Sequence, residues 1–166
     1  MILDLEEIKK RSKENQTANL RFISFLKEQN TAEIDTTIHE LYNYFIEKMD
    51  CTKCGNCCVH LRPILTERDI DILIKELKIS REKFKKAYIK TDEEGDMLFK
   101  HLPCKFLHNN KCSIYEFRTE DCRSYPHLHK DFLTHRLYGI FENYSICPIL
   151  DRAVAPLQLI FGRGSE

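Results

Sequence analysis

Apolar residues along the chain recur at spacings that predict helices joined by short loops. The strongest pattern covers residues 34–49, where apolar side chains at steps of three and four form one stripe of a helix that ends at Asp50. An earlier helix over residues 3–29 has a polar middle, and its apolar face comes late, over residues 20–26. We expect both apolar faces to pack into a core.

Two further helices are marked by residues that commonly cap helices. Thr66 precedes acidic and then apolar residues at helical spacing, and Ser80 precedes a short amphipathic segment. Residues 150–160 predict a terminal helix despite Pro156. The ending, residues 162–166, predicts a disordered tail.

The segment between these helices is less regular. Residues 97–101 predict a short strand, and residues 104–107 and 112–115 flank a His-Asn-Asn-Lys turn and predict a hairpin. Residues 119–125 predict one or two helical turns, whereas residues 131–144 are compatible with a helix or a second hairpin. The pattern as a whole predicts a mainly α fold with a small β-hairpin.

Composition adds an even balance of charge to this pattern. The chain has 166 residues, a length typical of one domain, and its 26 basic and 26 acidic side chains cancel. We expect no nucleic-acid partner and no membrane partner, since both normally leave a basic excess. The N-terminus lacks a secretory signal and no segment suits a membrane span. We therefore expect a cytoplasmic protein, in which cysteines are kept reduced.

The cysteines are the residues in this sequence that point most clearly to a functional site. Four of the 8 cysteines lie in the run Cys51-Thr-Lys-Cys-Gly-Asn-Cys-Cys58. Thiolates spaced C-x2-C can approach one ion together, and the run holds two overlapping pairs, Cys51 with Cys54 and Cys54 with Cys57. Gly55 supplies the backbone freedom that a tight metal-binding turn often requires. The run predicts a metal site without identifying the metal.

The adjacency of Cys57 and Cys58 restricts how they can bind. Adjacent side chains project about 100° apart around a helix and nearly opposite in an extended chain. The two thiols are therefore awkward ligands for one ion, which indicates two neighbouring centres or one thiol outside the coordination sphere. Eight thiols are enough for two sites of four. The remaining four are Cys104, Cys112, Cys122 and Cys147.

Zinc and iron are both compatible with these residues. The spacing of Cys51, Cys54 and Cys57, with a distant Cys147-Pro148, matches part of the bacterial ferredoxin run. The alternative function is therefore an iron–sulfur redox protein or enzyme. Disulfides are disfavoured because the chain is large enough not to need them. An isolated Cys147 also fits a small buried apolar residue, and His60 is the first substitute ligand if a site is mixed.

Five motifs follow one another in order. They are Cys51-x2-Cys54-Gly-x-Cys57-Cys58, Leu65-Thr-Glu-Arg-Asp-Ile70, Pro103-Cys-Lys-Phe-Leu107, Lys111-Cys-Ser-Ile-Tyr-Glu116 and Asp121-Cys-Arg-Ser-Tyr-Pro126. This set, over about residues 51–150, resembles the YkgJ-type cysteine-cluster family, the CxxCxxCC domains described as zinc- or iron-chelating. Arg118-Thr119 departs from the Arg-Pro that usually precedes the last motif, which predicts a looser turn and removes no ligand.

The resemblance implies metal chelation by the clustered cysteines, with zinc or iron as the cofactor, an iron–sulfur cluster included. Metal ions are then the partners, and no protein partner is identified. The family also includes flagellin lysine methylases, so a methylase-like activity stays open and no catalytic residue is assigned. The implied metal ligands are Cys51, Cys54, Cys57, Cys58, Cys104, Cys112, Cys122 and Cys147.

Together, these observations predict an irregular α+β domain organised around a cysteine metal centre. Residues 1–50 form an N-terminal helical segment packed on the core, residues 51–152 the cysteine-cluster metal-binding domain, and residues 153–166 a C-terminal helix and tail. We expect the three segments to make one structural domain. Metal removal is expected to unfold at least residues 51–126.

Overall fold

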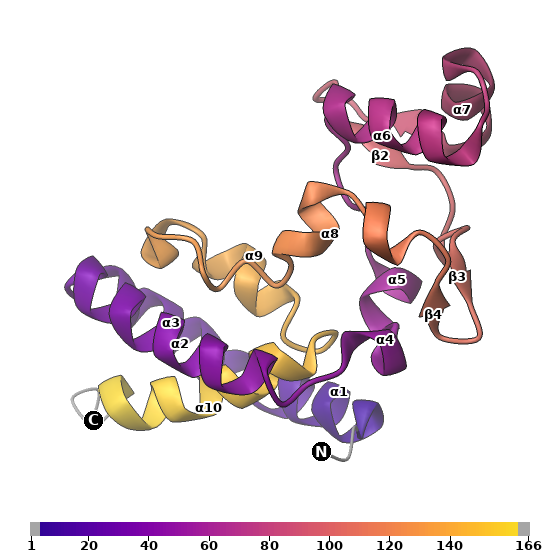
Figure 1. The fold of residues 1–166 in the computed structure, drawn as a ribbon. Helices are drawn as coiled ribbons and strands as arrows, with labels where there is room; N and C mark the ends of the chain where they lie inside the picture. Colours follow the sequence, from indigo (N-terminus) through magenta and orange to yellow (C-terminus); the bar gives the residue numbers. More distant parts are fainter. Residues whose placement is uncertain (1–3, 163–166) are drawn as a thin grey trace. The chain divides into compact units, whose positions relative to one another are not determined.

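The computed structural model describes residues 4–162 and is mostly helical, with two small antiparallel hairpins (Figure 1). This confirms the predicted fold class. The chain forms two compact units: unit 1 joins the chain up to Asp50 with the chain from Pro126 onward, and unit 2 is Cys51–Tyr125. The predicted tail beyond residue 162 lies outside the described residues. The segment boundaries predicted from the sequence stay predictions.

Unit 1 is built from helices that pack through apolar faces. α3 packs against α10 and η2, and α2 packs against α1, α9 and η2. Ile34 and Ile38 of α3 and Leu150 of α10 are at most 1% exposed, so the two longest helices supply the centre of this core. The elements are α1 (Leu5–Glu14), α2 (Gln16–Lys27), α3 (Thr31–Ile46), η2 (Leu133–His135), α9 (Leu137–Glu142) and α10 (Pro148–Phe161).

Buried carboxylates connect distant segments of unit 1. Asp35 on α3 accepts hydrogen bonds from the N–H groups of Phe132 (2.7 Å) and Leu133 (2.9 Å). Arg11 on α1 donates to Asp151 on α10 at 2.7 Å. Because these carboxylates are buried and partnered, they fix how the helices of unit 1 meet.

The helix boundaries of unit 1 differ from the sequence prediction in two places. The helix predicted over residues 3–29 is interrupted at Asn15, a weak helix former that ends α1 and begins α2. α3 ends at Ile46 rather than Asp50, because the chain tightens there into turns with Met49 N–H bonded to the Ile46 carbonyl. Residues 131–144, which the sequence left open between helix and hairpin, take the helical alternative as η2 and α9 joined by turns.

Unit 2 contains the two hairpins and the shorter helices. Its elements are α4 (Cys51–Cys54), α5 (Asn56–His60), α6 (Glu67–Leu77), α7 (Arg81–Tyr88), β1 (Ile89–Thr91), β2 (Met97–Phe99), β3 (Leu107–His108), β4 (Lys111–Cys112), η1 (Tyr115–Phe117) and α8 (Glu120–Ser124). The predicted caps are confirmed: Thr66 begins α6 with a capping box, and Ser80 begins α7.

The hairpins of unit 2 are shorter and more numerous than the sequence indicated. β1, placed by sequence at the end of a helix, pairs with β2 in the register Ile89 with Phe99. The β3–β4 turn has Asn109 and Asn110 at positive φ, 49° and 60°. Asn tolerates this conformation, which a two-residue hairpin turn requires.

A small apolar core holds α6, α7 and both hairpins of unit 2 together. Ile70, Leu73 and Phe84 are fully buried in it, and the half-buried Cys104 and Cys112 pack against its edge. The cluster itself is Leu65, Ile70, Leu73, Phe84, Phe99, Phe106 and Ile114. Within residues 4–162, no helix is long and apolar enough to cross a membrane.

Candidate metal centre

The cysteine run folds as two short helices joined at a glycine. α4 carries the first two cysteines of the run, Gly55 follows with φ 61°, and α5 carries the adjacent pair. A Cβ atom at position 55 would lie 3.2 Å from Leu107 Cδ1 and 3.3 Å from the Asn110 carbonyl oxygen. Glycine is therefore required both by the backbone conformation and by the close approach of the β3–β4 turn.

Backbone hydrogen bonds connect the run to the second hairpin. The Cys104 N–H donates to the Cys58 carbonyl at 2.7 Å, and the Leu107 N–H donates to the Cys104 carbonyl at 3.0 Å. Leu107 pairs in turn with Cys112 across β3 and β4. Three cysteines from separate parts of the sequence are thus brought into one region by the backbone.

Cys122 lies on α8, whose first turn is capped. Thr119 is 0% exposed, and its hydroxyl accepts the Cys122 N–H at 3.3 Å. Where the sequence predicted a looser turn at Arg118-Thr119, the structure has a buried cap. The backbone of Thr119 has φ −56° and ψ 157°, values that proline also adopts. Threonine here and proline in the usual Arg-Pro pattern are therefore compatible with the same backbone conformation.

The side chains of these cysteines also interact electrostatically. Burial raises the pKa of the Cys104 thiol to about 11, and the Cys58 and Cys112 thiols act in the same direction. Burial raises the pKa of Cys122 to about 12, with Cys58 and Cys104 adding to the effect. These thiols therefore influence one another's pKa. We refer to Cys58, Cys104, Cys112 and Cys122 as the four-thiol set.

Cys58 is the member of the set that comes from the run. A hydrogen bond with the Cys57 side chain, followed by burial, raises the pKa of Cys58 well above its ordinary value. Both residues lie in α5, where neighbouring side chains point about 100° apart. Cys58 also interacts with all three other members of the set, as the causes of their raised pKa values show.

The donor chemistry of the set suits zinc or iron, although the side chains do not stand in a coordination geometry. Within the described residues, no group of three or more His, Cys, Asp and Glu side chains is arranged to hold a metal ion. Four cysteines are nevertheless a common ligand set of structural zinc and of iron–sulfur clusters.

The other four predicted ligands are distributed differently. Cys51 is exposed, and Cys54 and Cys57 are half-buried, all three in unit 2. Cys147 is 6% exposed and precedes α10 in unit 1. Ligation by each of these residues stays a prediction. His60, considered as a substitute ligand, is exposed on α5.

Sequence reasoning assigned no role to Arg118 at this site. Its guanidinium carbon lies 3.8 Å from the centroid of the Tyr115 ring, and Nη1 donates to the Tyr115 carbonyl at 2.6 Å. Burial raises the pKa of Cys112, and the backbone of Ile114 and the Arg118 charge act in the opposite direction. The only signal in the sequence was a Tyr three residues before an Arg, which does not by itself indicate a nearby thiol.

The number and order of the cysteines identify the family. Residues 50–143 match the model of the family described as "CxxCxxCC: Putative zinc- or iron-chelating domain". The chain belongs to this CxxCxxCC family. The match confirms the resemblance seen in the motifs, includes the whole four-thiol set and supports metal binding in general. Neither the curated proteins nor the solved structures include a match to the chain.

Proposed function

We propose that the chain is a cytoplasmic metal-binding protein that chelates zinc or iron through the four-thiol set. The observation that carries this proposal is the convergence of Cys58, Cys104, Cys112 and Cys122 from four elements or loops that are separate in sequence. The backbone bond from Cys104 to Cys58, the β3–β4 pairing at Cys112 and the electrostatic coupling of Cys122 to Cys58 all support it. Free thiols that serve only as small apolar residues need no such convergence.

The three other cysteines of unit 2 form a second candidate site. Cys51 and Cys54 stand three residues apart in α4, a spacing that puts them on one face, and Cys57 follows beyond Gly55. The adjacent pair then belongs to two sites, with Cys57 in the second and Cys58 in the first. This division gives a physical reason for the doubled cysteine at the end of the CxxCxxCC motif.

Metal analysis of the full chain, purified anaerobically, tests the proposal. We expect stoichiometric zinc or iron in the wild type. Cys104→Ser and Cys122→Ser should each remove the metal of the four-thiol set. Cys58→Ser should lower the metal content without emptying the site of Cys51 and Cys54. A wild-type protein with neither metal, or serine variants that retain all of it, would overturn the proposal.

An iron–sulfur cluster is the second candidate, favoured by the ferredoxin-like spacing of the run and by the exposure of Cys51. Electron transfer to a partner requires a centre near the surface, and Cys51 satisfies this condition. The same preparation distinguishes the two. A cluster would give brown protein with visible absorption that bleaches on reduction. Colourless, zinc-replete protein from iron-sufficient cells would exclude the cluster.

A further inference from the structure

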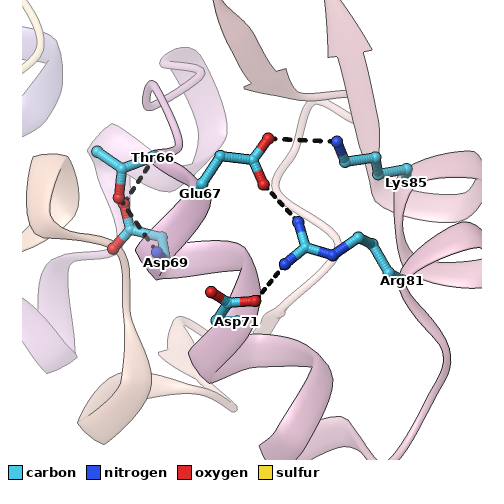
Figure 2. Close-up of polar contacts among 6 residues, drawn as sticks. All are labelled: Thr66, Glu67, Asp69, Asp71, Arg81 and Lys85. Atoms are coloured by element: carbon cyan, nitrogen blue, oxygen red, sulfur yellow. Dashed lines mark hydrogen bonds and ion pairs between the residues drawn. The ribbon is translucent and has the colours of Figure 1, made fainter.

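One buried carboxylate joins the beginnings of two helices in unit 2. Asp69 is 4% exposed. Its Oδ2 accepts hydrogen bonds from the Thr66 N–H at 2.9 Å and the Thr66 hydroxyl at 2.7 Å, which completes the capping box of α6 (Figure 2). Its Oδ1 accepts the N–H of Glu120, the first residue of α8, at 2.9 Å. Oδ2 therefore caps α6, whereas Oδ1 bonds to the first residue of α8.

The bond to Glu120 acts on the element that carries Cys122. α8 has 5 residues, too few to be stable without tertiary support. Cys122 lies two residues beyond Glu120, and its own N–H is bonded to the cap Thr119. The position of the Cys122 thiol consequently depends on where the first turn of α8 is held.

A second bond runs in the opposite direction between the same two segments. The Asp121 side chain on α8 accepts the N–H of Ile64, which lies just before α6, at 3.0 Å. Two hydrogen bonds therefore connect the start of α6 with the start of α8. Asp69 is nevertheless the buried member of the pair and the one that also completes a cap. A carboxylate needed only for the cap of α6 would leave Oδ1 to solvent, as first-turn carboxylates commonly do.

We propose that Asp69 is a positioning residue for the four-thiol set, because its Oδ1 holds the first turn of α8 and thereby sets the place of the Cys122 thiol. This inference rests on the proposed function, in which Cys122 is a metal ligand. Hydrogen-bonding groups behind metal ligands commonly change metal affinity by about 10- to 100-fold when they are lost.

Glu120→Pro removes the single N–H that Asp69 Oδ1 accepts. Proline is favoured at the first position of a helix, and the preceding Thr119 already has an extended backbone, φ −56° and ψ 157°, that proline accepts. The capping box of α6 is untouched. Glu120→Ala is the matched control, because it removes the same exposed side chain, with its contact to Arg123, and keeps the N–H.

Thiol alkylation resolved by residue gives a readout that general destabilisation would not produce. The zinc-loaded full chain is treated with iodoacetamide, and each cysteine is followed by mass spectrometry. In Glu120→Pro we expect the largest acceleration at Cys122, about 10-fold or more, with a smaller acceleration at Cys58, Cys104 and Cys112. Glu120→Ala should leave all four rates unchanged.

Two results would overturn the inference: an unchanged rate at Cys122 in Glu120→Pro, or an equal acceleration of all four thiols. If Glu120→Pro does not fold, Asp69→Asn takes its place, since its one oxygen cannot serve both Thr66 and Glu120. Failure of the proposed function looks different. If Cys122 is not a metal ligand, zinc does not slow its alkylation even in the wild-type chain. The positioning role of Asp69 is then excluded together with the proposed function.

Discussion

The two units of the molecule are held together by different means. Unit 1 has long helices, 16 residues in α3 and 14 in α10, around an apolar core with buried, partnered carboxylates. The cysteine-bearing helices of unit 2 have 4 or 5 residues each. Isolated helices shorter than about 12 residues are marginal in water. The cysteine elements therefore depend on tertiary bonds and, as proposed, on a metal.

Unit 2 is itself divided in the same way. α6 and α7 contribute buried side chains to its apolar cluster, whereas Cys104 and Cys112 only reach the edge of that cluster. The short cysteine-bearing segments are therefore positioned by backbone hydrogen bonds, although they contribute few side chains to an apolar core.

Removing the metal should affect the units unequally. Structural zinc commonly contributes on the order of 10 kcal/mol, so chelation should abolish amide protection in α4, α5, β3, β4 and α8. Amides of α3 and α10 should stay protected, because their apolar core does not involve the four-thiol set. Hydrogen exchange with mass spectrometry, before and after chelation, measures this. Equal loss of protection in both units would contradict the contrast.

Acidification should release the metal steeply. The thiolate is the ligand, and the pKa values of Cys104 and Cys122, about 11 and about 12, leave both thiols protonated at neutral pH. Each bound thiolate therefore displaces one proton, and four would change the affinity by about 10⁴-fold per pH unit, about 5 kcal/mol.

The sign follows from this displacement: affinity rises with pH and falls on acidification. A chelator competition between pH 6 and 8 measures the slope. A slope near one proton would show that a single thiol, not the four-thiol set, binds the ion.

Truncating the core of unit 1 should weaken stability and spare the metal. Leu150 is 0% exposed, so Leu150→Ala should cost about 2–5 kcal/mol by leaving a cavity in the α3–α10 core. Denaturant unfolding measures the loss, and metal content per chain should be unchanged. The exposed Leu159→Ala on the same helix is the matched control, expected to change little. Lost metal in Leu150→Ala would show that the units are not independent in this respect.

The smallest effect should come from the ion-pair network on the surface of unit 2. Arg81 bridges Glu67 and Asp71 of α6, and Lys85 contacts Glu67 at 3.3 Å (Figure 2). Hydrogen bonds from Arg81 and Lys85 lower the pKa of Glu67, but the pairs are exposed and screened by salt. Arg81→Met should therefore lower Tm by at most about 2 °C. In 1 M salt, thermal unfolding of the variant and the wild type should coincide.

Local signals in the sequence predicted local structure well. Thr66 and Ser80 cap helices because their hydroxyls reach the third residue of the helix, a contact that depends only on near neighbours. The Asn-Asn turn and the turn at Gly55 were also predicted from the sequence, because few residue types other than Gly and Asn adopt a positive φ. The short strand β1 was missed because its pairing with β2, rather than its own composition, makes it a strand.

The stripe on α3 shows where periodicity stops being informative. Apolar spacing predicted one continuous core face from Ile34 to Met49, yet only Ile34 and Ile38 are buried, and the later residues are half-buried or less. The periodicity of apolar residues shows which side of a helix is apolar, but it does not show whether another element covers that side. Leu20 on α2, which lies in the predicted apolar face over residues 20–26, is likewise 50% exposed.

The sequence by itself determined the family, the donor chemistry and the local turns, because each depends on residue type at short spacing. Only the tertiary structure decided which distant residues the cysteine-bearing segments contact. It bonded the Cys104 N–H to the Cys58 carbonyl and gave Asp69 a second partner in the N–H of Glu120. These contacts join residues far apart along the chain, and no periodicity records them, since they follow from packing rather than from spacing.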